Sequence, residues 1–245
     1  MRKEWLSVMG GLISSVGSGK NKGTIENRKV SVGSENFGYQ IYIPANVKKQ
    51  SSGLPVIVFL HGIGQRGSGG FVPTTGAIGA VIRQYFAQVP AIVLLPQCRA
   101  GVYWSDPVME KMVVNSLEKT VEEFAADNAR IYLTGVSMGG YGVWHFAVSQ
   151  PEKFAAYVSI CGGSSITNGD RYTPIAENIG KTPAWLFHGA EDRIVPVGES
   201  RQIVEAIKAK QGNVKYSEFA GVGHEVWLNV LSEKDLMPWL LAQRK

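Results

Sequence analysis

The chain has 245 residues, of which 44% are hydrophobic and 18% charged, and its formal net charge is +5. This composition excludes a disordered chain and allows a sizeable buried core. The positive charges are spread along the sequence without interleaved aromatic residues, so we expect a solvated surface and no nucleic-acid partner.

Residues 1–25 are expected to form a peripheral N-terminal segment. Arg2 and Lys3 precede a mildly apolar stretch, but glycines, serines and Glu4 interrupt the pattern of an export signal. We therefore expect a cytoplasmic protein, with secretion as the open alternative, and no membrane partner. The stretch GSGK at 17–20 is similar to a phosphate-binding loop. It lacks the first glycine, the Ser or Thr and the preceding strand of that motif, so we discard it.

The rest of the chain alternates predicted strands and helices. Two segments with alternating polarity predict half-exposed antiparallel strands, at 28–32 and 39–44. Nearly continuous apolar runs are typical of the central strands of a parallel sheet, and they lie at 54–60, 91–96, 129–134, 154–160 and 183–188. A further strand is expected at 214–219, and helical patterns occupy 76–88, 107–127, 138–149, 198–210 and 234–243.

This alternation predicts one domain over residues 1–245. Its fold class is α/β, a three-layer sandwich with a mostly parallel central sheet, helices on both faces and right-handed crossovers. Asp106 followed by Pro107 is a typical N-cap and first-turn pair for the helix that begins there.

The loop at 59–70, FLHGIGQRGSGG, contains three glycines in the G-x-G-x-x-G spacing of a dinucleotide-binding turn. That fold also requires an acidic residue about twenty positions later. No Asp or Glu lies between Glu35 and Asp106. We therefore expect the backbone amides of this loop to face a different negative charge.

Ser137 is the candidate nucleophile. It is the centre of GVSMG, residues 135–139, between a predicted strand and a predicted helix. The two glycines allow a sharp turn that exposes a serine hydroxyl above the sheet, and the helix N-terminus favours developing negative charge. The alternative is that Ser137 merely caps the helix.

A serine needs a base, and the chain has four histidines. His61 belongs to the glycine-rich loop, His145 lies within the helix after Ser137, and His188 ends a strand where structural hydrogen bonds are expected. His224 lies on a late, glycine-flanked loop, so it is the base by elimination and position. A carboxylate must orient the imidazole, and the segment after His188 offers two adjacent candidates, Glu191 and Asp192.

Four motifs together resemble the α/β-hydrolase superfamily: LHGIGQRG, GVSMGGYGVWHFAVSQPEKFAAYVSICGG, HGAEDRIVPV and GVGHEVW. More narrowly, the chain is similar to small single-domain carboxylesterases, the phospholipase/carboxylesterase, feruloyl-esterase and polyhydroxybutyrate-depolymerase-like group. The resemblance implies a triad of Ser137, Asp192 and His224. It also implies an oxyanion hole formed by the amides of Ile63 and Met138.

The loop reads H-G-I-G rather than the H-G-G-G of hormone-sensitive-lipase-like esterases. Residues 162–182 are too short for a large lid, so we expect an open site. Trp104 and Trp227, with Tyr103, either line the substrate pocket or only pack the loops.

The expected reaction is hydrolysis of short-chain or aromatic, hydroxycinnamate-type carboxylic esters through an acyl-enzyme, without metal or cofactor. Alternatives are an acyl-thioesterase or serine peptidase with the same triad, and a non-catalytic binding module. Cys98 and Cys161 are expected to be two buried thiols, because a pair so far apart makes no disulfide framework. The partner is a small-molecule ester, and the sequence makes no prediction of oligomeric state.

Overall fold

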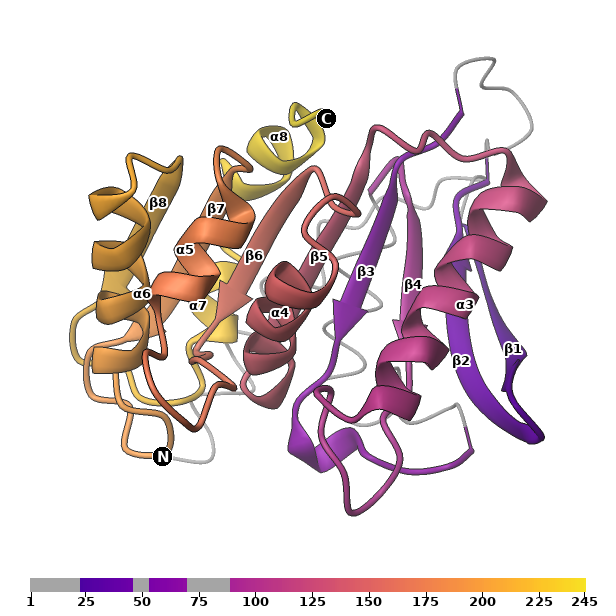
Figure 1. Cartoon of the computed structure of the whole chain (residues 1–245). Helices are drawn as coiled ribbons and strands as arrows, with labels where there is room; N and C mark the ends of the chain where they lie inside the picture. Colours follow the sequence, from indigo (N-terminus) through magenta and orange to yellow (C-terminus); the bar gives the residue numbers. More distant parts are fainter. Residues whose placement is uncertain (1–22, 46–52, 70–88) are drawn as a thin grey trace, which may run out of the picture.

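An eight-stranded sheet runs through the computed structural model, which describes residues 23–45, 53–69 and 89–245 (Figure 1). The helix predicted at 76–88 and most of the N-terminal segment lie outside the described residues. A single domain over the whole chain therefore stays a prediction.

The strand order is β1-β2-β4-β3-β5-β6-β7-β8. The strands are β1 (Thr24–Val32), β2 (Glu35–Ile43), β3 (Val56–Leu60), β4 (Ile92–Pro96), β5 (Ile131–Val136), β6 (Ala156–Ile160), β7 (Ala184–Gly189) and β8 (Val214–Phe219). β1 and β2 form an antiparallel hairpin that joins β4 antiparallel, and the other six strands run parallel. Every predicted strand is present, which confirms the mostly parallel sheet.

Helices cover both faces of this sheet (Figure 1). They are α3 (Pro107–Phe124), α4 (Met138–Ser149), α5 (Thr173–Ile179), α6 (Gly198–Ala209), α7 (Trp227–Val230) and α8 (Leu236–Leu241), with the short 3-10 helix η2 (Ile63–Gln65) after β3. Helices α3 to α6 share one apolar core with the sheet, whereas α7 and α8 pack into a second core on the opposite face. The predicted three-layer α/β-hydrolase sandwich is thereby confirmed.

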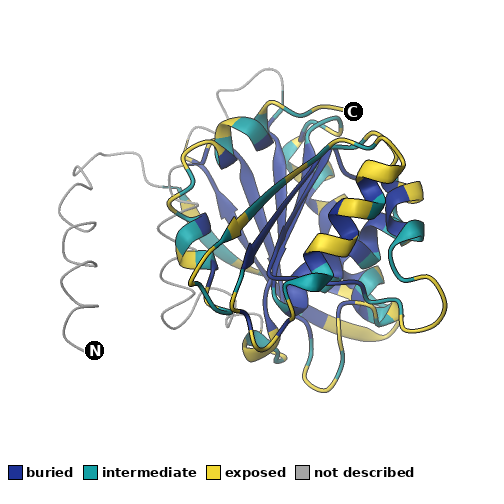
Figure 2. Cartoon of the chain, turned by 90° about the vertical axis from the view of Figure 1, so that its left-hand side faces the viewer, coloured by how far each residue is buried: buried dark blue, intermediate teal, exposed yellow. Residues whose placement is uncertain are grey.

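The central strands are buried because their residues are apolar on both sides. All five residues of β3, β4 and β6 are buried, whereas the edge strand β8 contains no buried residue. Figure 2 shows the buried strands between helices whose outer surfaces are exposed. α3 begins as the sequence predicts, because the Asp106 side chain accepts hydrogen bonds from the amides of Val108 and Met109.

The chain order places functional loops at one edge of the sheet. From β3 the chain moves to β4 on one side, and then returns to β5 on the other side of β3. At such a switch in strand order, the loops after neighbouring strands diverge and leave room for a ligand at their carboxyl ends. The loops after β3 and β5 therefore flank the expected site.

The connection between β6 and β7 holds α5 as its helix, and no large lid lies over the carboxyl edge in the part of the chain that the structure describes. In the same residues, no helix is long and apolar enough to cross a membrane.

Candidate active site

Ser137 occupies a sharp turn between β5 and α4. Its backbone has φ 55° and ψ −118°, a sparsely populated conformation for a residue other than glycine. The side chain makes no capping hydrogen bond, so the structure does not support the capping alternative. A side chain at Gly135 would overlap the backbone of Gly139, and one at Gly139 would overlap the carbonyl of Leu60. The two glycines are thus required for the turn that presents Ser137.

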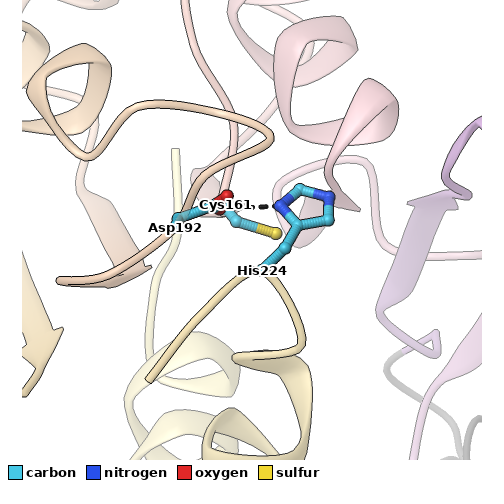
Figure 3. A group of neighbouring side chains, drawn as sticks. All are labelled: Cys161, Asp192 and His224. Carbon is cyan, nitrogen blue, oxygen red and sulfur yellow. Dashed lines mark hydrogen bonds and ion pairs between the residues drawn. The ribbon is translucent and has the colours of Figure 1, made fainter. Parts of the chain in front are cut away.

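His224 lies within hydrogen-bond distance of Ser137, as the sequence predicts. Its Nε2 is 2.9 Å from Ser137 Oγ, and its Nδ1 is 2.7 Å from Asp192 Oδ2. Figure 3 shows the imidazole facing the Asp192 carboxylate. Because a carboxylate only accepts, Nδ1 carries the proton and Nε2 is free to accept one from the serine hydroxyl. The structure thus brings the three predicted residues into one hydrogen-bonded chain.

Two backbone amides hold the Asp192 carboxylate in place beside His224. Its Oδ1 accepts hydrogen bonds from the amides of Ile194 and Val195, at 2.8 and 2.9 Å. Burial raises the pKa of this carboxyl, but the hydrogen bonds from His224 and the two amides outweigh burial and leave the pKa below its usual value. The competing carboxylate, Glu191, is exposed and takes no part in this arrangement.

His188 adds a contact that the sequence did not predict. Its Nε2 is 3.0 Å from the Val195 carbonyl and 3.3 Å from Asp192 Oδ2, and its Nδ1 is 2.7 Å from Ser200 Oγ. Since a carbonyl only accepts, Nε2 carries the proton and Nδ1 accepts from the serine hydroxyl. Burial lowers the pKa of His188. A neutral His188 therefore supports the side of Asp192 that faces His224.

The loop after β3 carries Ile63, the first residue of η2. It passes next to the nucleophile, because a side chain at Gly62 would lie 3.7 Å from Ser137 Cβ. Met138 follows Ser137 directly as the first residue of α4. The amide of a first helical residue has no partner inside its own helix, so both predicted donors can serve a ligand. Their role in an oxyanion hole stays a prediction.

His61 ties this loop to the end of β4. Its Nε2 accepts a hydrogen bond of 3.0 Å from the Cys98 amide, and its Nδ1 donates to the Gly62 carbonyl at 2.6 Å. The Trp104 indole N–H donates to the His61 carbonyl at 3.0 Å. The position of His61 directly after a buried strand was visible in the sequence, but these partners were not.

The two candidate pocket residues have different surroundings. Trp104 is only 1% exposed, belongs to the core and packs its ring 5.0 Å from that of His61. It packs the loops, as the alternative interpretation has it, and its ring is too buried to line an open substrate site. Trp227 is half-buried, with its ring 5.9 Å from that of His224 in an edge-to-face contact. Tyr103 is exposed and lies under the Arg66 guanidinium.

A serine on the turn between a parallel strand and a helix, at the carboxyl edge of a sheet with this order, defines an α/β hydrolase. Residues 94–234, more than half of the chain, match the phospholipase/carboxylesterase family, and the chain belongs to that family. It is thus a hydrolase of the esterase type.

Named relatives agree with this class. Over 204 residues the chain is 26% identical to acyl-protein thioesterase 1 of Saccharomyces cerevisiae. The match covers 69% of this chain and 84% of that protein. Over 138 residues it is 24% identical to acetylxylan esterase A of Emericella nidulans. This match covers 52% of this chain and 42% of that protein.

Solved structures give the same fold. A thermostable esterase superposes with a TM-score of 0.79 at 31% identity, covering 91% of this chain and 63% of its own. The feruloyl esterase module of Clostridium thermocellum superposes with a TM-score of 0.69 at 17% identity, covering 91% of this chain and 89% of its own. The chain therefore spans less than two thirds of the thermostable esterase and less than half of the acetylxylan esterase.

Proposed function

We propose that the protein is a serine carboxylesterase that hydrolyses short-chain or aromatic carboxylic esters through an acyl-enzyme. The observation that carries this proposal is the hydrogen-bonded chain from Ser137 Oγ to His224, at 2.9 Å, and from His224 to Asp192, at 2.7 Å. Nucleophile, base and orienting carboxylate stand in the order and geometry that acyl transfer requires.

In the first step, His224 Nε2 takes the hydroxyl proton of Ser137 while Oγ bonds to the ester carbonyl carbon. The carbonyl oxygen becomes an oxyanion, which the amides of Ile63 and Met138 stabilise, each donor by about 3 kcal/mol of barrier. Asp192 stabilises the imidazolium. The oxyanion then collapses, the bond to the leaving oxygen breaks, and His224 gives its proton to the departing alcohol.

In the second step, a water molecule loses a proton to His224 Nε2 and attacks the acyl carbon. The tetrahedral intermediate collapses, the bond to Ser137 Oγ breaks, and the serine oxygen recovers its proton from His224. The carboxylic acid leaves and the resting enzyme returns. Apart from the ester and the water, every group in this cycle belongs to the chain, so the proposed reaction requires no metal or cofactor.

The surroundings of Ser137 support small or aromatic acyl groups. Two apolar side chains in the short helices that follow β3 and His224 are exposed, Ile63 in η2 and Leu228 in α7. Trp227 packs next to His224, where an aromatic acyl or alcohol group could lie against it. Without a lid over the described carboxyl edge, a long lipid chain would stay largely in water, which favours short or flat substrates.

A second candidate is thioester hydrolysis, which the likeness to acyl-protein thioesterase 1 favours. The same residues would perform it, with a thiolate instead of an alkoxide as the leaving group. A peptidase or a non-catalytic binding module remains the more distant alternative.

The test combines labelling with a substrate panel. A fluorophosphonate probe should modify Ser137, located by peptide mass spectrometry, and Ser137→Ala should lose both labelling and turnover while keeping its circular dichroism spectrum. No adduct at Ser137 would overturn the enzyme function. Turnover should be highest with p-nitrophenyl acetate, butyrate or methyl ferulate; a clear preference for the octanoate, a thioester or a peptide amide would overturn the substrate class.

A further inference from the structure

Cys161 lies directly beside the candidate triad. It follows β6, is fully buried, and has a φ of 40°, which is uncommon for a residue other than glycine. Its sulfur, an Asp192 carboxylate oxygen and a His224 ring nitrogen all lie within 4.8 Å of one another (Figure 3). No step of the proposed ester hydrolysis uses this thiol.

The backbone around Cys161 fixes the sulfur in this place. The Cys161 amide donates to the Phe187 carbonyl at 2.8 Å, which ties the residue to β7. A side chain at Gly162 would overlap the backbone of Gly140, so α4 and the end of β6 approach closely. The Ser137 amide faces the sulfur and favours the thiolate form, but burial dominates and raises the pKa of the thiol to about 12.

The three donor atoms form a set that soft cations prefer. One sulfur, one imidazole nitrogen and one carboxylate oxygen suit Zn²⁺ and its heavier congener Cd²⁺, whereas Mg²⁺ and Ca²⁺ prefer oxygen ligands. Zinc bonds of about 2.3 Å to sulfur and about 2.0–2.2 Å to nitrogen and oxygen need donors about 3.5 Å apart. The donors now lie within 4.8 Å of one another, and the Asp192–His224 pair is 2.7 Å apart. Side-chain rotations that move these atoms by about 1 Å, bringing the sulfur closer and separating the pair, would therefore convert the present cluster into such a site.

We propose that Cys161, Asp192 and His224 bind one thiophilic divalent cation, Zn²⁺ or Cd²⁺, and that the bound ion inhibits the esterase. The binding half of the proposal is independent of the proposed function, and the inhibition half rests on it. The ion enters from the side of His224, whose side chain is 19% exposed, because Cys161 and Asp192 are covered.

Binding balances in both protons and charge. The resting cluster holds a thiol, a carboxylate and a neutral imidazole, with a charge of minus one. The ion displaces the thiol proton to solvent and bonds to the sulfur, to Asp192 oxygen and to His224 Nδ1. The Nδ1 proton moves to Nε2. The product holds a thiolate, a carboxylate and a dication with no net charge, so no unpaired charge is buried.

Inhibition follows from the position of the proton. With the cation on Nδ1 and the proton on Nε2, His224 no longer accepts the hydroxyl proton of Ser137. Asp192 is at the same time withdrawn from the imidazole. The nucleophile then has no base, and turnover stops without any change at the acyl or oxyanion side of the site.

The experiment measures Cd²⁺ binding through the ultraviolet charge-transfer absorption of the cadmium–thiolate bond, and turnover of p-nitrophenyl acetate in the same titration. Cys161→Ala removes the sulfur. Cys98→Ala is the matched control, because Cys98 is the other buried thiol and follows β4, not β6. The wild type and Cys98→Ala should develop the band with one ion per chain and lose turnover in parallel, and a chelator should restore it.

Cys161→Ala should show no band and need at least about tenfold more Cd²⁺ or Zn²⁺ for half inhibition. Equal inhibition of Cys161→Ala and the wild type, or inhibition without a thiolate band in the wild type, would overturn the proposal. If Cys161→Ala fails to fold, Cys98→Ala decides, because Cys161 is then the one thiol left, and loss of the band in Cys98→Ala would overturn the proposal. Ser137→Ala should keep the band. A band in the wild type without loss of turnover would retain the binding site and refute the inhibition, while a catalytically inactive wild type would count against the proposed function alone.

Discussion

Acid should loosen the loop that carries Ile63, through protonation of His61. The His61 ring is 1% exposed, and burial lowers its pKa to about 4. Protonation would add a hydrogen to Nε2, which accepts the Cys98 amide. A donor would then face a donor in a buried site, and the link between this loop and the end of β4 would break.

The magnitude follows from linkage. An unfolded histidine titrates near 6.5, so between pH 6.5 and 4 the unfolded chain binds a proton that the folded chain does not. Stability therefore falls as the pH falls through this window and levels off below the folded pKa. A shift from about 6.5 to about 4 removes about 2 kcal/mol by pH 5 and about 3 kcal/mol by pH 4. Both values are a substantial part of the stability of a typical domain.

The assay is reversible urea unfolding of the wild type and His61→Gln at pH 7, 5 and 4. At pH 7 the wild type should be the more stable, because the variant disturbs buried hydrogen bonds. Relative to pH 7, this difference in unfolding free energy should be smaller by about 2 kcal/mol at pH 5 and by about 3 kcal/mol in total at pH 4, since the variant has no ring to protonate. Other titrating groups, including the buried His188, remain in both proteins and cancel. A difference that stays constant from pH 7 to 4 would refute the assigned state of His61.

Gly139→Ala should abolish soluble protein or lower the free energy of unfolding by more than about 4 kcal/mol, because its methyl group would overlap a backbone carbonyl of β3, whereas Gly64→Ala meets nothing within 4 Å and should be tolerated. Denaturant midpoints compare the two, and an equally stable Gly139→Ala would contradict the close packing. Asp192→Asn should fold but lower kcat by on the order of 10³–10⁴, since the imidazole loses its orienting carboxylate; a loss below tenfold in p-nitrophenyl acetate turnover would count against that role. Trp104→Ala should cost about 3–5 kcal/mol of stability, whereas Trp227→Ala should mainly raise KM. The reverse result would return Trp104 to the substrate pocket.

Most of the sheet was predictable because its strands are apolar on both faces, which leaves few alternatives for runs of this length. The apolar pattern does not define where each strand ends. β5 continues through Gly135 and Val136, two residues beyond its predicted end, because these residues still pair with Ser159 and Ile160 of β6. The short helices α5 and α7 were missed, since helices of seven and four residues depend on packing more than on their own sequence.

The candidate site was predicted through chain order, and its neighbours were not. Ser137, Asp192 and His224 follow three different strands, and the order of these strands implies that their loops meet. Strand order does not predict which way a side chain on such a loop points, because that direction depends on contacts with residues far away in the sequence. Trp104 lies on a loop at the expected edge, yet it points into the core because its N–H finds the His61 carbonyl there.

The adjacency of β5, β6 and β7 explains why the triad and the proposed cation site share atoms. One residue of the cluster follows the end of each strand: Ser137 follows β5, Cys161 follows β6 and Asp192 lies three residues after β7. Neighbouring parallel strands lie about 4.8 Å apart, so a residue that follows the middle strand must lie between the nucleophile and the carboxylate. A small buried side chain suffices there for packing. A cysteine fills the space equally well while it keeps its proton, and it becomes a ligand when a soft cation replaces that proton.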